Sequence, residues 1–357
     1  MTLFPEKIVS LLKRSFSINS PYHVQWMITR KCNYKCKDCS VWKNQTNEPE
    51  ISTEDVKIGL DILRDLGVVE IVFSGGNPLL RDDIGEIVSY ASKYFVTTVY
   101  DNGSMALEKI DELRDADFVA ISIDSLDPKK NDYIKGVHGA WENAMTAIRR
   151  LKEKGILVGV SPTISQINLN EIIDLTNYFV DRGIPVWYCL YYYDKPSCPQ
   201  LFSIGVEDSE FEFKDKLAAA KLFDELLKLK REKRGVFITE KTLMALRELF
   251  LSNRRIWSCK ALKNFFVIDN YGRVAGCHLK KPVASIFELP KLWKSQKFEK
   301  LRKRYNKCKD CAYLCYIFYS LYSNASGTLS IFFDQFRNLK WVLPKIYNRR
   351  AHVKNLT

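Results

Sequence analysis

Short apolar runs alternate with amphipathic stretches over the first half of the chain, and this alternation restricts the fold more than any other feature. The predicted strands are His23–Thr29, Val68–Ser74, Val96–Tyr100, Phe118–Ile123, Leu157–Thr163 and Val186–Tyr192. The predicted helices between them are Thr53–Leu66, Asp82–Lys93, Ala106–Arg114, Ala140–Lys154 and Asn170–Arg182. Continuous Val- and Ile-rich strands are typical of parallel sheets buried on both faces. The sequence therefore predicts an α/β fold, a parallel barrel or open sheet, with functional loops at the carboxyl ends of its strands.

The rest of the chain differs from this alternating region in composition. Two further helices are predicted, Phe213–Arg234 and Glu240–Asn253, after a turn-rich boundary near Pro199. The predicted units are an amphipathic segment 1–21, the alternating region 22–198, a helical connector 199–255, a cysteine-rich region 256–316 and an aromatic, basic tail 317–357.

Composition excludes several classes of protein. With 46% hydrophobic and 27% charged residues in 357, the chain can bury a full core and is not globally disordered. It contains no run of eighteen apolar residues, and its N-terminus lacks the pattern of a secretory signal. We therefore expect a cytoplasmic protein whose ten cysteines are ligands or buried thiols and not a disulfide framework.

The first of two cysteine groups directly follows the first predicted strand. Cys32, Cys36 and Cys39 have C-x3-C-x2-C spacing. Three thiolates on one loop can hold three irons of a cubane cluster and leave the fourth iron open to a small molecule. A structural zinc ion would need a fourth ligand, and none stands nearby, so zinc with a distant ligand is the alternative. Cys189 and Cys198 stand apart from both groups and are predicted to be ordinary thiols.

The first group and the next predicted strand end together resemble the radical SAM superfamily. Tyr34 is the aromatic residue before the second cysteine, and Gly75-Gly76-Asn77-Pro78 resembles the family's Gly-Gly-Glu-Pro turn, with Asn77 in place of Glu. Paired glycines at a strand end expose backbone groups to a polar ligand.

Weaker matches follow at the later strand ends. Asn102 lies in a turn that resembles the family's Thr-Asn-Gly, with Asp101 in place of Thr. Ser122 and Asp124 resemble the Ser-x-Asp segment, whose Ser commonly touches S-adenosylmethionine (SAM). The next segment is matched by Asp132, Lys135, Gly136 and Gly139, with Lys135 replacing Arg. Each match alone is also typical of an ordinary turn; their order at successive strand ends supports the resemblance.

The resemblance implies a partial (β/α)6 TIM-like barrel and a [4Fe-4S] cluster whose open iron is chelated by SAM. Gly75, Gly76, Asn77, Pro78, Asn102, Ser122 and Asp124 are then the expected cofactor-binding residues. It also implies that reductive cleavage of SAM yields a 5′-deoxyadenosyl radical, which abstracts a substrate hydrogen, and that an electron donor such as flavodoxin or ferredoxin supplies the electron. No catalytic base is assigned.

The second cysteine group is Cys259, Cys277, Cys308, Cys311 and Cys315. A predicted hairpin around Asn270-Tyr271-Gly272 brings Cys277 toward Cys259. Such pieces could form a zinc knuckle, for which His278 offers a nitrogen ligand.

The same region resembles the SPASM and Twitch auxiliary-cluster regions, since Cys259, Gly272 and Cys277 match the opening and Cys308-x2-Cys311 matches the closing pair. The resemblance implies one auxiliary [4Fe-4S] cluster held by Cys259, Cys277, Cys308 and Cys311, with Cys315 as a spare ligand. Ligation by four cysteines favours a role in electron transfer, and the alternatives are substrate binding at an open iron and a purely structural clamp.

The periphery is basic, and the formal net charge is +13. Amphipathic residues 3–18 and the aromatic, basic tail fit either peripheral membrane contact or packing on the barrel with solvated cations. No nucleic-acid-binding signature accompanies them. The resemblance to SPASM and Twitch enzymes implies a peptide or protein substrate, whereas the amphipathic ends and the charge favour a lipid or lipid precursor. The opposing hypothesis is a zinc-stabilised binding protein without redox chemistry.

Overall fold

The fold is described from a computed structural model, which defines residues 20–43, 47–192, 205–206, 209–322, 330, 333–335 and 338. The amphipathic residues 3–18, Cys198 and most of the tail lie outside these residues. Within them, no helix is long and apolar enough to cross a membrane.

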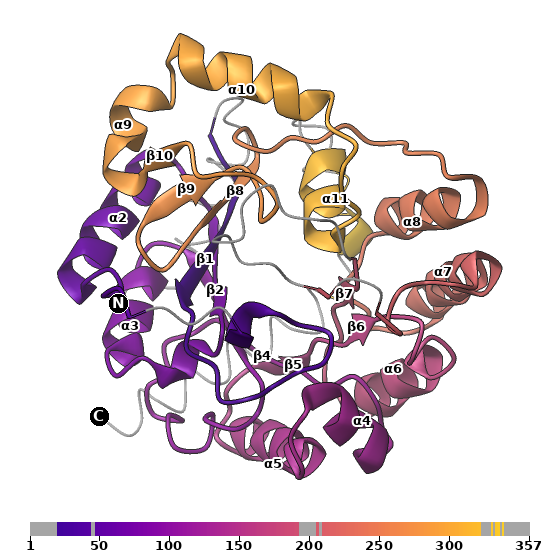
Figure 1. Cartoon of the computed structure of the whole chain (residues 1–357). Helices are drawn as coiled ribbons and strands as arrows, with labels where there is room; N and C mark the ends of the chain where they lie inside the picture. The colour runs from indigo at the N-terminus through magenta and orange to yellow at the C-terminus, as the bar shows by residue number, and fades with distance from the viewer. Residues whose placement is uncertain are drawn as a thin grey trace.

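A parallel sheet forms the centre of the molecule (Figure 1). Its barrel strands are β1 (His23–Thr29), β2 (Glu70–Gly75), β3 (Val96–Asp101), β4 (Phe118–Ile121) and β5 (Val158–Val160), paired in that order. The first four predicted strands are thus confirmed to within two residues at each end. Because each strand follows the last in parallel, all their carboxyl ends meet at one edge, where the cysteine loop and the glycine turn lie.

The last two predicted strands are shorter than expected. Leu157–Thr163 divides into β5 and β6 (Thr163–Ile164), and Pro162, which has no N–H group, stands between them. Val186–Tyr192 is reduced to a parallel bridge from Val186 to Val160 and to β7 (Cys189–Leu190), which pairs with β6.

Helices surround the sheet in Figure 1, and most were predicted. The barrel helices are α2 (Thr53–Asp65), α3 (Ile84–Ser92), α5 (Ala140–Glu153) and α6 (Ile172–Asp181), followed by α7 (Lys216–Glu232) and α8 (Glu240–Ser252). Ser52 caps α2 by accepting a hydrogen bond from the backbone N–H of Asp55. Helix α4 (Pro128–Lys135) was not predicted, although Asp127, Pro128 and Gly136 supply its cap, first residue and left-handed stop.

The predicted helix Ala106–Arg114 is wrong, because this segment forms a run of turns. Asp101 accepts hydrogen bonds from the backbone N–H groups of Gly103 and Ala106, which fixes the entry to the segment. Further along the segment, the backbone hydrogen bonds alternate between two types. Lys109 N donates to Met105 O, four residues back as in an α-helix, whereas Glu112 N donates to Lys109 O, three residues back as in a 3-10 turn.

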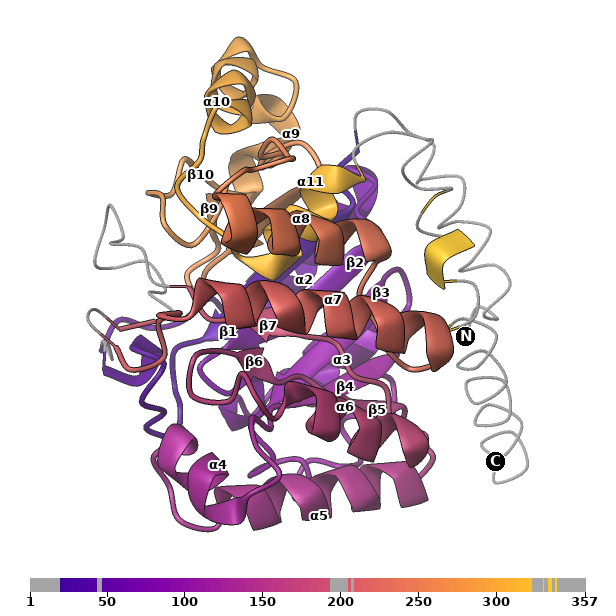
Figure 2. The ribbon, with the colours of Figure 1, turned by 90° about the vertical axis from the view of Figure 1, so that its right-hand side faces the viewer.

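The cysteine-rich region extends the same sheet. The predicted hairpin is confirmed as β8 (Phe265–Ile268) and β9 (Arg273–Ala275), and β8 pairs in parallel with β1. It continues with β10 (Ala284–Ser285), the 3-10 turn η3 (Ile286–Glu288), α9 (Leu289–Leu292), α10 (Gln296–Asn306) and α11 (Leu314–Leu321). Helix α11 crosses the predicted boundary at residue 316, and α10 lies at one end of the molecule in both ribbon views (Figures 1 and 2).

Candidate functional site

The loop of the first three cysteines leaves the carboxyl end of β1 and is held by its neighbours. The backbone N–H of Lys37 donates to the carbonyl of Ile134 in α4 at 2.9 Å. Asn143 of α5 donates to the Tyr34 hydroxyl at 3.1 Å. The indole N–H of Trp42, in the 3-10 turn η1 (Val41–Lys43), donates to the carbonyl of Cys36 at 3.0 Å. Three separate elements therefore hold the loop that carries the thiols, two through its backbone and one through the Tyr34 side chain.

The paired glycines pack directly against the base of this loop. The backbone N–H of Gly76 donates to the carbonyl of Thr29, and that of Asn77 donates to the carbonyl of Lys31. A Cβ on Gly76 would lie 2.1 Å from the Lys31 oxygen, and one on Gly75, whose φ is 136°, would lie 2.2 Å from the Thr29 oxygen. No larger residue fits this approach without moving the chain that leads into Cys32.

Asn77, which stands where the family usually has Glu, hydrogen-bonds to Asp101, the second departure from the family pattern. Its side-chain amide donates to Asp101 at 2.7 Å and to Asn102 at 3.1 Å, while its carbonyl oxygen caps the 3-10 turn η2 (Pro78–Leu80) through Leu79 N. Burial raises the pKa of Asp101 to about 6, against the lowering effect of the Asn77 bond. A glutamate at position 77 would place a second carboxylate beside Asp101.

The network reaches the cysteine loop through Asn33. Asn102 donates to the side-chain oxygen of Asn33 at 3.0 Å, and Asn33 donates to the Ser104 hydroxyl at 2.7 Å. The structure therefore brings together three of the predicted segments: the cysteine loop, the glycine turn and the Asn102 turn. Pro78 is buried in η2 beside them, and Ser122 is half-buried at the end of β4.

A buried ion pair lies below the cysteine loop. Lys135 donates to Asp124 at 2.6 Å, and the two side chains are 6% and 1% exposed. The other carboxylate oxygen of Asp124 accepts the Thr163 N–H at 2.7 Å. Lys135 also interacts electrostatically with Cys36 and Asp38, so it places a positive charge near the thiols. Both oxygens of Asp124 are thus engaged within the protein.

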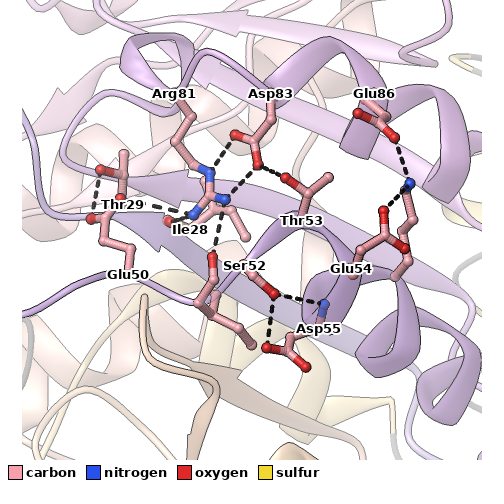
Figure 3. Close-up of polar contacts among 12 residues, drawn as sticks. Ile28, Thr29, Glu50, Ser52, Thr53, Glu54, Asp55, Arg81, Asp83 and Glu86 are labelled. Atoms are coloured by element: carbon pink, nitrogen blue, oxygen red, sulfur yellow. Dashed lines mark hydrogen bonds and ion pairs between the residues drawn. The ribbon is translucent and has the colours of Figure 1, made fainter.

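A second polar network lies at the base of the cysteine loop and also contacts the cysteine-rich region. Figure 3 shows its part around Glu50, Arg81 and Asp83. Glu50 accepts hydrogen bonds from the Thr29 hydroxyl at 2.8 Å and from the Arg30 N–H at 2.9 Å. Arg81 donates to the carbonyl of Ile28 and to Asp83, and it lies 3.8 Å from Glu50. Asn270, in the turn of the β8–β9 hairpin, donates to the same Glu50 oxygen at 3.3 Å. No sequence pattern points to Glu50, because its partners are up to 220 residues away along the chain.

Four cysteines of the second group line one cavity: Cys259, Cys277, Cys308 and Cys311. They come from the segment before β8, the end of the hairpin and the loop after α10. Tyr316 of α11 lines the same cavity, and its hydroxyl is buried without a hydrogen-bond partner among the described residues. The exposed pair Lys280–Asp310 lies at its rim, with 2.6 Å between nitrogen and oxygen.

Cys315 and His278 lie outside this cavity lining. Cys315 interacts electrostatically with Cys311 and with Cys189, whose thiol lies 3.6 Å from the Ser161 hydroxyl. The His278 ring contacts the side chain of Gln25 at 3.1 Å, and burial lowers the pKa of His278 to about 3. His278 is therefore neutral and aimed at β1.

Both thiol sets fit iron–sulfur ligation by their donor chemistry. Desolvation raises the pKa of Cys39 and of Cys311 to about 12 and that of Cys259 to about 11, so these thiols are protonated until a metal displaces the proton. The buried Tyr316 hydroxyl has no hydrogen-bond partner among the described residues, and it is suited to donate a hydrogen bond to a cluster sulfide in the cavity of the auxiliary cysteines. Among the described residues, no three thiol, imidazole or carboxylate groups lie close enough together to hold a metal ion as they stand. Iron–sulfur ligation is therefore supported by the type of the donor groups and by their position on one loop or around one cavity.

Family comparisons agree with this division into two sites. The family model of the radical SAM superfamily matches residues 26–179. The chain therefore carries a radical SAM domain. A second model, SPASM, an iron–sulfur cluster-binding domain, matches residues 259–312. Radical SAM domains bind a [4Fe-4S] cluster with SAM, and SPASM domains bind auxiliary clusters. The predicted family and fold are confirmed, and a zinc-stabilised binding protein is not favoured.

Individual relatives match parts of the chain. An AdoMet-dependent heme synthase of Nitratidesulfovibrio vulgaris is 31% identical over 170 residues, 46% of each chain. The subtilosin biosynthesis protein AlbA of Bacillus subtilis is 29% identical over 168 residues, 46% of this chain and 38% of AlbA. The chain spans about half the length of the first curated relatives it matches. The structure of Streptococcus suis SuiB bound to S-adenosylmethionine shares the fold, with a TM-score of 0.65 at 16% identity, over 84% of this chain and 71% of SuiB.

Proposed function

We propose that this protein is a radical SAM enzyme that cleaves SAM reductively and uses the resulting radical to abstract a hydrogen atom from its substrate. The observation that carries the proposal is the hydrogen-bonded network that joins the Cys32–Cys39 loop, the Gly75–Gly76 turn and Asn102 into one site. When bound, a [4Fe-4S] cluster with SAM supplies the one-electron cleavage of the sulfonium and the 5′-deoxyadenosyl radical.

The protein residues in this proposal bind and orient. Cys32, Cys36 and Cys39 hold the cluster, and the backbone of Gly75, Gly76, Asn77 and Pro78 lies against the methionine part of SAM. Asn102 and Ser122 offer half-buried side chains to the rest of SAM. Asp124 is a positioning residue, since both of its oxygens bind Lys135 and Thr163.

Metal analysis and SAM cleavage test this proposal together. Anaerobically reconstituted protein should hold about eight iron atoms per chain, and replacing Cys32, Cys36 and Cys39 by Ala should remove about half of them. The same variant should form no 5′-deoxyadenosine with dithionite as reductant. Cys189→Ala, a barrel thiol outside both sets, is the control and should retain the iron. Zinc in place of iron, or no SAM cleavage by the unchanged chain, would contradict the proposal.

The proposed substrate is a peptide. SuiB, which shares the fold over 84% of this chain, has also been solved bound to the precursor peptide SuiA. A library of short peptides incubated with the reduced enzyme and SAM should yield a modified product whose formation depends on SAM and on Cys32. Mass spectrometry would show the change as a loss of hydrogen or a new cross-link.

A tetrapyrrole is the second candidate substrate, because several relatives that match about half of this chain are named heme synthases or an Fe-coproporphyrin III synthase. An optical titration with iron coproporphyrin III separates the two classes. A saturable shift of the Soret band would favour the tetrapyrrole over the peptide.

We also propose that the protein is cytoplasmic and touches an anionic membrane surface through its basic tail, most of which lies outside the described residues. Replacing Arg337, Lys340, Lys345, Arg349 and Arg350 by Gln should reduce its flotation with vesicles that contain phosphatidylglycerol. A lipid substrate would require such contact. Equal flotation of both proteins would contradict a role for these cations.

A further inference from the structure

A basic groove lies beside the auxiliary cysteines. It is a cavity of about 610 Å³ between α10 and the chain that leads into β8. Its cationic lining consists of Lys260, Lys263, Lys294, Arg302, Lys303 and Lys307, and Glu299 is its one acidic lining residue. We call these residues the basic groove. Figures 1 and 2 place α10 at the outer end of the molecule, so the groove belongs to the surface of the cysteine-rich region.

The charge of the groove is poorly compensated. Lys263, Lys294, Lys303 and Lys307 form no ion pair with any of the described acids. The chain from Lys291 to Lys309 carries nine lysines and arginines and one acid, Glu299. Six lysines and arginines line this one cavity with a single acid, so like charges lie close together and repel one another. An anionic partner would relieve this repulsion.

The shape of the groove is fixed by its own residues. Arg302 donates to the carbonyls of Leu262 at 2.7 Å and Trp293 at 2.6 Å, and it pairs with Glu299 at 2.6 Å. Its guanidinium also lies 4.8 Å from the Trp293 ring centroid. Arg302 thus holds α10 against the start of β8, while the lysines around it remain available to a ligand.

The position of Cys259 shows which anionic partner suits the groove. Cys259 lines both the basic groove and the cavity of the four auxiliary cysteines. A partner seated in the groove would therefore contact a predicted iron ligand directly. A membrane surface or a nucleic acid would gain nothing from this contact, whereas an electron carrier would come within short range of the auxiliary site.

We propose that the basic groove docks an acidic one-electron carrier protein of the flavodoxin or ferredoxin class. This inference rests on the proposed function, because a radical SAM enzyme must receive electrons one at a time. In the docked complex the reduced carrier loses one electron and the group held by Cys259, Cys277, Cys308 and Cys311 gains it. No bond forms or breaks and no proton moves.

Direct binding tests the proposal without relying on turnover. The reconstituted full-length protein is titrated with a purified acidic bacterial flavodoxin, and separately with a plant-type [2Fe-2S] ferredoxin, by microscale thermophoresis at low and physiological salt. We expect the affinity of at least one carrier to fall steeply as salt rises, because screening shortens the reach of the groove charges. The variant Lys263→Gln/Lys303→Gln/Lys307→Gln should bind that carrier about tenfold more weakly.

The matched control removes the same charge elsewhere. Lys154→Gln/Lys216→Gln/Lys228→Gln changes three exposed lysines at the end of α5 and on α7, and it should bind the carrier within about twofold of the unchanged protein. Equal weakening by both triple variants would show that net charge alone drives binding and would overturn the proposal. Unchanged binding by the groove variant would do the same.

Two further measurements separate this proposal from its alternatives. If phosphatidylglycerol vesicles or transfer RNA bind more tightly than either carrier and lose that binding in the groove variant, the groove serves another anion and the proposal fails. SAM cleavage by the unchanged protein with dithionite needs no carrier. SAM cleavage without carrier binding would therefore contradict the docking site alone. Carrier binding without SAM cleavage would contradict the proposed function alone.

Discussion

The two cysteine groups are built in opposite ways. Cys32, Cys36 and Cys39 lie on one loop of eight residues, and hydrogen bonds with α4, α5 and η1 hold this loop in place. The auxiliary cysteines span 259–311 and come from three separate pieces of chain. A short loop gathers its ligands at little entropic cost, whereas the distant set must first fold its hairpin and α10. The first site is therefore organised by local chain and buried contacts, and the second by the fold around it.

The ion pairs beside the two groups give the largest test of this difference. Lys135–Asp124 is almost fully buried, while Lys280–Asp310 is 32% and 48% exposed. Lys135→Met leaves an unpaired buried carboxylate and should lower the free energy of unfolding by about 3–5 kcal/mol. Lys280→Met should cost at most about 1 kcal/mol. Urea unfolding of both reconstituted variants measures the two losses in the free energy of unfolding. Equal losses would contradict the expected difference between the two ion pairs.

The glycine turn tests how tightly the first loop is packed. Gly76→Ala forces a Cβ to within 2.1 Å of the Lys31 oxygen unless the chain moves. We expect a loss of about 1–3 kcal/mol and of most of the iron held by the Cys32–Cys39 loop. Gly139→Ala is the control, since its Cβ would meet nothing within 4 Å and its cost comes only from a φ of 79°. The measurement is the iron content per chain of both variants. If Gly76→Ala holds as much iron as the unchanged protein, the close contact between Gly76 and Lys31 is not needed for the site.

The Asn77–Asp101 pair can be tested with a double-mutant cycle. Asn77→Glu places two carboxylates side by side and should weaken SAM binding, and adding Asp101→Thr should restore most of the affinity. The expected coupling is about 1–2 kcal/mol. Equilibrium dialysis with labelled SAM measures all four proteins. If the two changes are additive, the departures at 77 and 101 do not compensate each other.

The sequence was most informative where structure is local. The first four strands, the hairpin and both cysteine groups follow from apolar runs, turn residues and spacing. The predicted helix Ala106–Arg114 failed because the segment forms turns that mix four-residue and three-residue backbone hydrogen bonds, a distinction that its apolar pattern does not carry. Glu50 and the Asn77–Asp101 bond escaped prediction because their partners come together only through the tertiary fold. The charge of α10 was visible in the sequence, but its position beside Cys259 was not.

The smallest expected effect concerns Tyr316, which has no counterpart in the loop of the first group. Its hydroxyl is buried in the cavity of the auxiliary cysteines without a hydrogen-bond partner among the described residues, so it is available to donate to a bound cluster. Such a bond stabilises the reduced, more negative state. One hydrogen bond of about 0.5–1.5 kcal/mol corresponds to about 20–60 mV for a single electron, so Tyr316→Phe should lower the auxiliary midpoint potential by that amount. A redox titration followed by electron paramagnetic resonance resolves the two sites. The midpoint of the Cys32–Cys39 site serves as the internal control and should not move. A shift at both sites, or at neither, would remove Tyr316 from the auxiliary site.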